Sequence, residues 1–139
     1  MRARFAAAVV LAVAGALSIS CGGIVDPSKN VVETFTGTVA PQTTSTLHPV
    51  STSNNGEFSV KITTMTPAFT GFIGVLIAIG PSDNSCAGNL QLWTTPNGFA
   101  TVNSIALSGQ MIPGHYCVGL YDIGTLAATE TYTIQVSHP

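Results

Sequence analysis

The 139-residue sequence predicts an all-β protein, a sandwich of two antiparallel sheets that follows an N-terminal signal peptide. Three observations predict this fold class. Apolar and polar residues alternate along several short segments, as they do in strands with one buried face. Turn-forming Gly, Pro and Asn residues separate these segments. No segment after residue 21 has the apolar spacing of a helix. We expect about eight strands in a jelly-roll or Greek-key-like arrangement.

Residues 1–20 have the three-part form of an export signal. Arg2 and Arg4 form a short basic start, and the uncharged apolar run 5–17 follows. Small serines then flank the expected cleavage site. A run of 13 residues is shorter than the roughly 20 that a membrane-spanning helix needs. A buried core helix is the alternative, but the basic start and the small residues at the end favour a signal peptide.

Cys21 directly follows these small residues, which resembles the lipobox of bacterial lipoproteins. In that family the cysteine becomes the lipidated first residue of the mature chain. The family prefers leucine three places before the cysteine, whereas here that place holds Ser18 and Leu17 lies one residue earlier. The segment also suits ordinary signal peptidase, and the alternative is a soluble secreted protein with a free thiol. Because such a thiol can oxidise or cross-pair outside the cell, we favour lipidation.

This interpretation divides the chain into three parts. Residues 1–20 are the signal peptide, residues 21–30 a lipidated tether, and residues 31–139 a single β-sandwich domain. The tether is rich in Gly, Pro and Ser and shows no periodicity. The expected location is the bacterial cell envelope, with the membrane contacted through the N-terminal lipid.

Cys86 and Cys117 remain as an even pair once Cys21 is assigned to the anchor. In an oxidising compartment two such cysteines most simply form a disulfide. Closing a loop of about 30 residues would stabilise the fold by about 3–4 kcal/mol in the chain-entropy model. Neither cysteine belongs to a C-x-x-C pair or a metal-like cluster, so neither a redox nor a zinc role is expected.

The charge balance excludes nucleic acid as a partner. The whole chain has a formal net charge of −2, and without Arg2 and Arg4 only Lys29 and Lys61 remain against six acids, which gives −4. A nucleic-acid binder neutralises phosphates with several Lys or Arg side chains. After the signal, the longest apolar stretch is the eight residues 72–79, too short to cross a membrane.

The first three expected strands cover residues 33–39, 46–53 and 57–63. In the first and third, apolar side chains alternate with polar ones, which indicates half-buried strands. Pro49 marks the second as an edge strand, because proline cannot donate to a ladder. An Asn-Asn-Gly turn signal at 54–56 separates the second from the third.

The remaining strands follow from similar patterns. The segment 72–79 is apolar on both faces and is expected to be a central strand. Within the expected strand 100–107, a change of phase predicts a bulge near Asn103 and Ser104. The expected strands of this half of the chain are 72–79, 90–94, 100–107, 115–121 and 131–137.

The last third of the chain carries two strand motifs. Pro113-Gly114-His115-Tyr116-Cys117-Val118 is followed by Tyr132-Thr133-Ile134-Gln135-Val136. They resemble the end of bacterial pre-peptidase C-terminal domains, where a G-x-Y-x-V strand precedes a final Y-x-[IL]-x-V strand. Gly37-Thr38-Val39 and Phe58-Ser59-Val60 fit the same scheme, so the resemblance covers roughly residues 33–138. It implies a compact β-sandwich outside the cell.

In that family the module is usually appended to secreted peptidases, where it is cleaved off or helps to bind substrate. Here no catalytic domain accompanies it, and Cys86 and Cys117 are not general features of the family. They look like those of small lipoproteins with a stand-alone version of the fold. Some collagen-binding relatives hold calcium through an acidic N-terminal linker. The tether here offers only Asp26 and then Glu33, so that calcium site is not carried over.

No catalytic site is predicted. A hydrolase needs a nucleophile, a base and an orienting group, yet no serine lies in a Gly-x-Ser-x-Gly elbow. Nothing in the sequence places His48, His115 or His138 beside a particular serine, and there is no zinc motif. Asp83 and Asp122 are candidate ligands for calcium, or a carboxylate pair for glycoside hydrolysis, if the disulfide brings their segments together. Their spacing matches no calcium-binding loop, and no cofactor is expected.

Trp93 and Tyr121 are the candidate ligand-binding residues, since aromatic rings offer an apolar face with a polar edge. A polar, charge-poor surface suits uncharged partners, either glycan or another envelope protein. The predicted function is therefore a non-catalytic binding or structural module at the cell envelope. The alternative is an accessory or targeting subunit of a secreted hydrolase. An enzyme with an unrecognised site is the third hypothesis.

Overall fold

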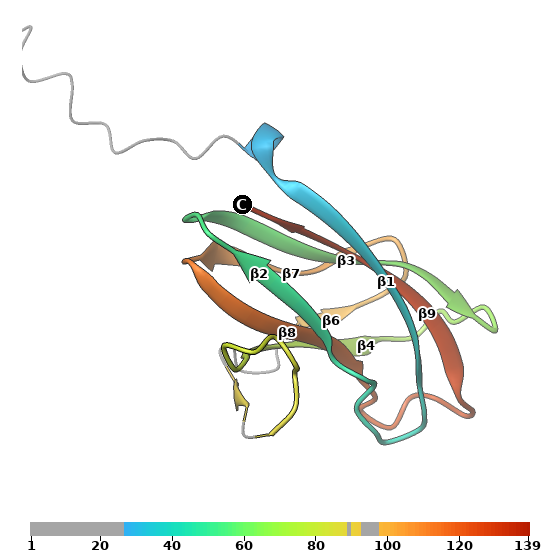
Figure 1. Cartoon of the computed structure of the whole chain (residues 1–139). Coiled ribbons are helices and arrows are strands. Elements are labelled where there is room, and N and C mark those ends of the chain that lie inside the picture. Colours follow the sequence, from blue (N-terminus) through green and yellow to red (C-terminus); the bar gives the residue numbers. More distant parts are fainter. Residues whose placement is uncertain (1–26, 89, 93–97) are drawn as a thin grey trace, which may run out of the picture.

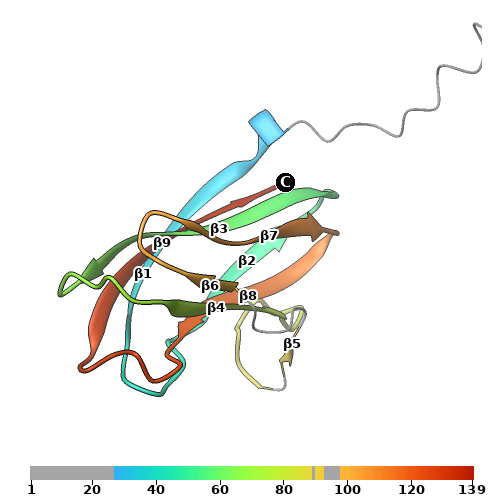
Figure 2. The same ribbon diagram turned by 180° about the vertical axis from the view of Figure 1, so that it is seen from behind.

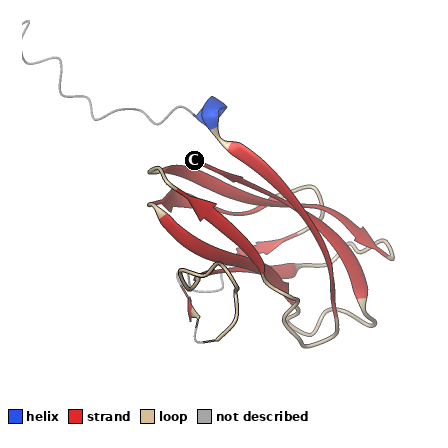
Figure 3. Ribbon diagram, viewed as in Figure 1, coloured by secondary structure: helices blue, strands red, loops and turns tan. Residues whose placement is uncertain are grey.

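The computed structural model describes residues 27–88, 90–92 and 98–139. These residues form two antiparallel sheets packed face to face (Figures 1 and 3). A three-residue 3-10 helix, η2 (Pro27–Lys29), precedes the first strand. The predicted all-β sandwich is thereby confirmed. The expected signal peptide and Cys21 lie outside the described residues.

Nine strands are present among the described residues. In chain order they are β1 (Val31–Val39), β2 (His48–Thr52), β3 (Gly56–Thr66), β4 (Ile73–Ile79), β5 (Gln91–Leu92), β6 (Gly98–Ala100), β7 (Ile105–Met111), β8 (Gly114–Tyr121) and β9 (Glu130–His138). The first sheet has the order β1-β9-β3-β7. The second has the order β2-β8-β4-β5, and β6 also pairs with β4.

The chain changes sheet at every connection between strands except those that join β4, β5 and β6 (Figure 2). Strands that follow one another in sequence are therefore seldom neighbours in a sheet, as in jelly-roll and Greek-key folds. No helix in the described ranges has the length and apolar composition to cross a membrane.

Alternation along the strands decides which side chains fill the space between the sheets. In β3, Phe58, Val60 and Ile62 are buried and their neighbours face outward. A β-bulge between Ile62 and Thr64 shifts this phase, so that Met65 is the next buried residue. Because the bulge breaks the alternation, the pattern that predicts 57–63 does not extend over the last three residues of β3.

The predicted strand 100–107 is wrong. Residues 101–104 form a turn that carries the chain from β6 in the second sheet to β7 in the first. In this turn Asn103 adopts a φ of 69°, and its amide donates to the Ile62 carbonyl at 2.7 Å. The expected bulge lies further along, in β7, where Val60 pairs with Leu107 and Lys61 with Ile105.

The predicted disulfide between Cys86 and Cys117 is confirmed, with Cα atoms 5.6 Å apart. Tyr116 and Val118 belong to the core, so Cys117 between them lies on the outer face of β8. The disulfide therefore attaches the loop after β4 to the outer surface of the second sheet. Of the predicted strand 90–94, residues 90–92 are described, and Gln91–Leu92 form β5.

Candidate functional site

Three large apolar side chains are exposed together at one end of the second sheet. Phe72, Phe99 and Ile123 are 56%, 46% and 48% exposed, and they line a shallow hollow of about 300 Å³. They come from three segments: the residue before β4, strand β6 and the connection after β8. Isolated exposed apolar residues are common, but a contiguous apolar patch marks a surface for interaction. We call these three residues the apolar hollow.

Gly74 makes room beside the apolar hollow. It pairs with Phe99 of β6 on one side and with Tyr121 of β8 on the other, so the three residues form one row across the sheet. A Cβ atom at Gly74 would lie 2.2 Å from the Tyr121 ring, which shows that this ring lies against the glycine. The Phe99 and Tyr121 ring centroids are 6.3 Å apart. Burial raises the pKa of the Tyr121 hydroxyl.

Of the two aromatic residues predicted from the sequence, Tyr121 thus borders the hollow and Trp93 lies outside the described residues. Sequence reasoning missed Phe72, Phe99 and Ile123. Phe72 belonged to a segment that is apolar on both faces, which hides the side to which each residue points. Phe99 directly follows the turn signal Pro96-Asn97-Gly98, and none of the expected strands includes it. One residue of the sequence could have indicated the site, namely Gly74, a glycine within an otherwise bulky strand. A glycine inside a strand often marks a place where another group approaches the backbone closely.

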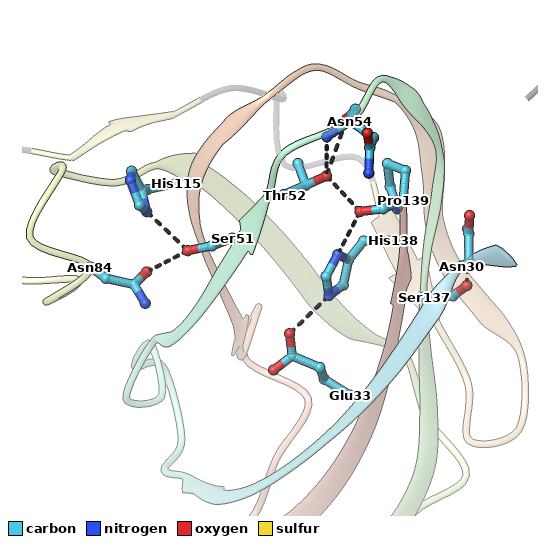
Figure 4. Close-up of polar contacts among 10 residues, drawn as sticks. All are labelled: Asn30, Glu33, Ser51, Thr52, Asn54, Asn84, His115, Ser137, His138 and Pro139. Atoms are coloured by element: carbon cyan, nitrogen blue, oxygen red, sulfur yellow. Dashed lines mark hydrogen bonds and ion pairs between the residues drawn. The ribbon is translucent and has the colours of Figure 1, made fainter.

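A serine and a histidine meet on the surface (Figure 4). Ser51 Oγ lies 2.9 Å from His115 Nδ1 and donates to Asn84 Oδ1 at 3.1 Å. With the single proton of the Ser51 hydroxyl donated to Asn84, the contact with His115 is met by the histidine tautomer that carries a proton on Nδ1. In this arrangement His115 does not accept the serine proton, which nucleophilic catalysis would require.

A second serine and a second histidine contact Tyr132 between the two sheets. The Tyr132 hydroxyl donates to Ser45 Oγ at 3.0 Å and lies 2.9 Å from His48 Nε2. Ser45 Oγ in turn accepts the Leu120 amide at 3.0 Å, and the His48 ring stacks on Phe35. Burial lowers the pKa of His48 and so favours its neutral form. This network fastens the β1–β2 connection to both sheets, with Ser45 and Tyr132 buried and His48 half-buried.

The third histidine joins strand ends (Figure 4). His138 Nε2 of β9 lies 2.8 Å from Glu33 Oε1 of β1. Thr52 Oγ1 of β2 donates to the Pro139 main-chain oxygen at 2.6 Å. Side chains of all three strands therefore tie this end of the sandwich together.

The structure does not bring Asp83 and Asp122 together. Asp83 lies in the loop after β4, and the first residue of this loop, Gly80, donates its backbone amide to the His115 carbonyl at the beginning of β8. Asp122, in contrast, follows the end of β8. Hydrogen bonds from Ser85 are the main cause of the lowered pKa of Asp83. An eight-residue strand separates the two carboxylates, so they cannot share one ion. Within the described part of the chain, no three His, Cys, Asp or Glu side chains gather to hold a metal.

Asp122 has its acceptor positions filled by the protein. Its carboxylate accepts the amide of Gln42 at 2.8 Å, both the amide and hydroxyl of Thr125 at 2.9 and 3.0 Å, and the amide of Leu126 at 3.2 Å. Burial acts to raise the pKa of this carboxyl, but these hydrogen bonds outweigh it and lower the pKa to about 2. Asp122 is therefore an organiser of two connections.

Comparisons of the chain with models of protein families, with curated proteins and with solved structures found no match.

Proposed function

We propose that this chain is an exported, lipid-anchored, non-catalytic module whose contact surface is the apolar hollow. The observation that carries the proposal is the exposure of Phe72, Phe99 and Ile123 around one hollow. When a partner covers apolar surface of this kind, that surface is removed from contact with water, and this favours binding. The two pairs of Ser and His side chains offer no comparable basis for catalysis.

The chemistry of the hollow favours a protein partner over a glycan. A sugar ring stacked on an aromatic face also needs polar groups near its hydroxyls. The three residues that line the hollow are apolar. An apolar side chain from an envelope protein would match these walls, and Tyr121 at the border adds aromatic surface of the kind enriched in protein interfaces.

Export and anchoring rest on the sequence pattern of residues 1–21. The Cys86–Cys117 disulfide supports export, because such bonds persist in oxidising compartments and are rare in the cytosol. The likeness to pre-peptidase C-terminal domains stays a prediction from the sequence, and so does the role of accessory subunit.

The test is photo-crosslinking in the native cell. A photoreactive amino acid replaces Phe72 in one variant and Thr131, exposed on the outer face of the other sheet, in the control. We expect a discrete crosslinked product with an envelope protein from position 72 only. Adding Ile123→Asp, which places a charge in the hollow, should abolish it. Equal crosslinking from both positions, or retention on envelope polysaccharide that Ile123→Asp removes, would overturn the protein-binding proposal.

A further inference from the structure

Three of the exposed sheet edges carry features that discourage pairing with a further strand. At the edge formed by β2, Pro49 cannot donate a backbone hydrogen bond. At the edge formed by β7, the bulge interrupts the register. In the described part of the chain, the remaining edge of the second sheet consists of β5 and β6, which have two and three residues. Proline, bulges and short strands are all means by which proteins keep sheet edges from pairing with other chains.

β1 has none of these features. It has nine residues and pairs with β9 in continuous register from Val31 to Val39. It stands last in the order of the first sheet, so its outer edge presents the backbone groups of alternate residues. Among the described residues, no backbone hydrogen bond outside the strand ladders involves β1. Figure 1 shows β1 as a long strand that runs in front of β9 and β3 in that view.

Glu33 is the one charged residue of β1, and a charge on an edge strand can itself oppose pairing. Here its carboxylate lies 2.8 Å from His138 Nε2 of β9. The charge is therefore engaged within its own sheet.

The sequence of β1 is self-complementary about Phe35. If two copies pair antiparallel with Phe35 on the two-fold axis, Thr34 faces Thr36 of the second copy. Glu33 then faces Gly37 of the second copy, which has no side chain to crowd it. No like charges meet, and β-branched residues face one another, which favours a strand pair.

We propose that β1 pairs antiparallel with β1 of a second copy of this chain, which joins two four-stranded sheets into one continuous sheet. The interface is isologous, as in most two-fold dimers. A single edge strand covers less than the roughly 800 Å² per partner of a standard interface. The dimer therefore forms at high protein concentration, such as that on a membrane surface.

The first experiment measures sedimentation of the chain from residue 21 onward, carrying Cys21→Ala, over two orders of magnitude in concentration. We expect reversible dimerisation. Thr34→Lys with Thr36→Lys places like charges across the seam and should weaken dimerisation about tenfold or more. The control is Thr64→Lys with Thr131→Lys, on exposed residues of the same face away from the edge. A second variant carries both Thr34→Glu and Thr36→Glu. Mixed with the lysine variant, it should form a heterodimer, because opposite charges then face each other across the two strands.

The second experiment reports the register. Chains with Thr34→Cys mixed with chains with Thr36→Cys should form an intermolecular disulfide, because these positions face each other. Either variant alone should not, since two identical positions are then offset by two residues along the strands, beyond disulfide reach. A wild-type chain that stays monomeric throughout, equal effects of the two lysine pairs, or no selective crosslink each overturns the proposal.

Discussion

Asp122 holds two connections of the chain in place with one side chain. Its carboxylate accepts from Gln42 before β2 and from Thr125 and Leu126 before β9. We expect Asp122→Asn to lower the free energy of unfolding by about 1–3 kcal/mol, because the new amide group would face the Gln42 amide, another donor. Urea unfolding at neutral pH measures this change. Asp83→Asn, in an exposed loop, is the control and should keep the wild-type midpoint; an unchanged midpoint for Asp122→Asn would contradict the assignment.

The Asp122 carboxyl also makes the free energy of unfolding depend on pH in the acidic range. Burial opposes ionisation, but the hydrogen bonds outweigh it and lower the folded-state pKa of Asp122 from 3.8 to about 2. A lowered folded-state pKa contributes stability that is complete above the unfolded-state pKa and is lost as the pH falls through the folded-state value. The difference in unfolding free energy between wild type and Asp122→Asn should thus be constant from neutral pH to about 5 and shrink between about 4 and 2. A difference that stays constant down to about pH 2 would show that the carboxyl is not responsible.

Gly37 in β1 is required by the buried polar network behind it. A Cβ atom there would lie 2.6 Å from the Tyr132 hydroxyl, and Tyr132 is fully buried with its hydroxyl bonded to Ser45. We expect Gly37→Ala to cost about 1–3 kcal/mol, as overpacking of a filled core does. Thermal unfolding followed by circular dichroism tests this, with Thr38→Ala at the exposed neighbour as control. A variant as stable as the control would mean that Tyr132 can move aside.

At the scale of elements, the disulfide is the main covalent constraint on the second sheet. It links the loop after β4 to β8 across a separation of 31 residues. In the chain-entropy model its loss costs about 3–4 kcal/mol, because the unfolded chain regains freedom. Cys86→Ala with Cys117→Ala should therefore lower the urea midpoint, and reductant should lower that of the wild type but not of the double variant. Cys21→Ala should leave the urea midpoint unchanged. A decrease in midpoint for Cys21→Ala as large as that of the double variant would show that Cys21 contributes to the stabilising disulfide.

How far an element could be predicted depended on whether one of its faces is buried. Residues 57–63 and 131–137 were predicted because a strand with one buried face alternates visibly in sequence. The segment 100–107 was not, because its apolar residues belong to two strands in different sheets and a change of sheet leaves no periodic sign. The exposed residues 108–110 of β7 gave no alternation to detect.

The candidate site was harder to predict than the strands, for a physical reason. Phe72, Phe99 and Ile123 are far apart in sequence and meet only because β6 and β8 both pair with β4. Local pattern identifies apolar residues but not which sheet face they share. Tyr121 was the exception, since it stands one residue beyond the last core position of β8, where alternation places it on the outer face.

At the scale of the whole molecule, the order of strands separates the proposed surfaces. The apolar hollow lies on the second sheet beside β4, β6 and β8, whereas β1 is an edge of the first sheet. A partner in the hollow and a second copy along β1 would thus use different sheets. Photo-crosslinking at position 72 and the lysine variants of β1 can therefore fail or succeed independently.

The prediction that concerns the whole chain is its anchor, and the intact mass of the non-reduced protein from its native membrane fraction tests it first. We expect a chain that begins at Cys21, carries a lipid-sized addition and lacks two hydrogens because Cys86 and Cys117 are joined. Cys21→Ala should move the protein out of the membrane fraction, because the proposed lipid is what retains it there. An unmodified chain found only in the medium would instead make this a diffusible module. In that case the apolar hollow would have to find its partner without confinement to a surface, and the weak β1 pairing would lose the high local concentration on which it depends.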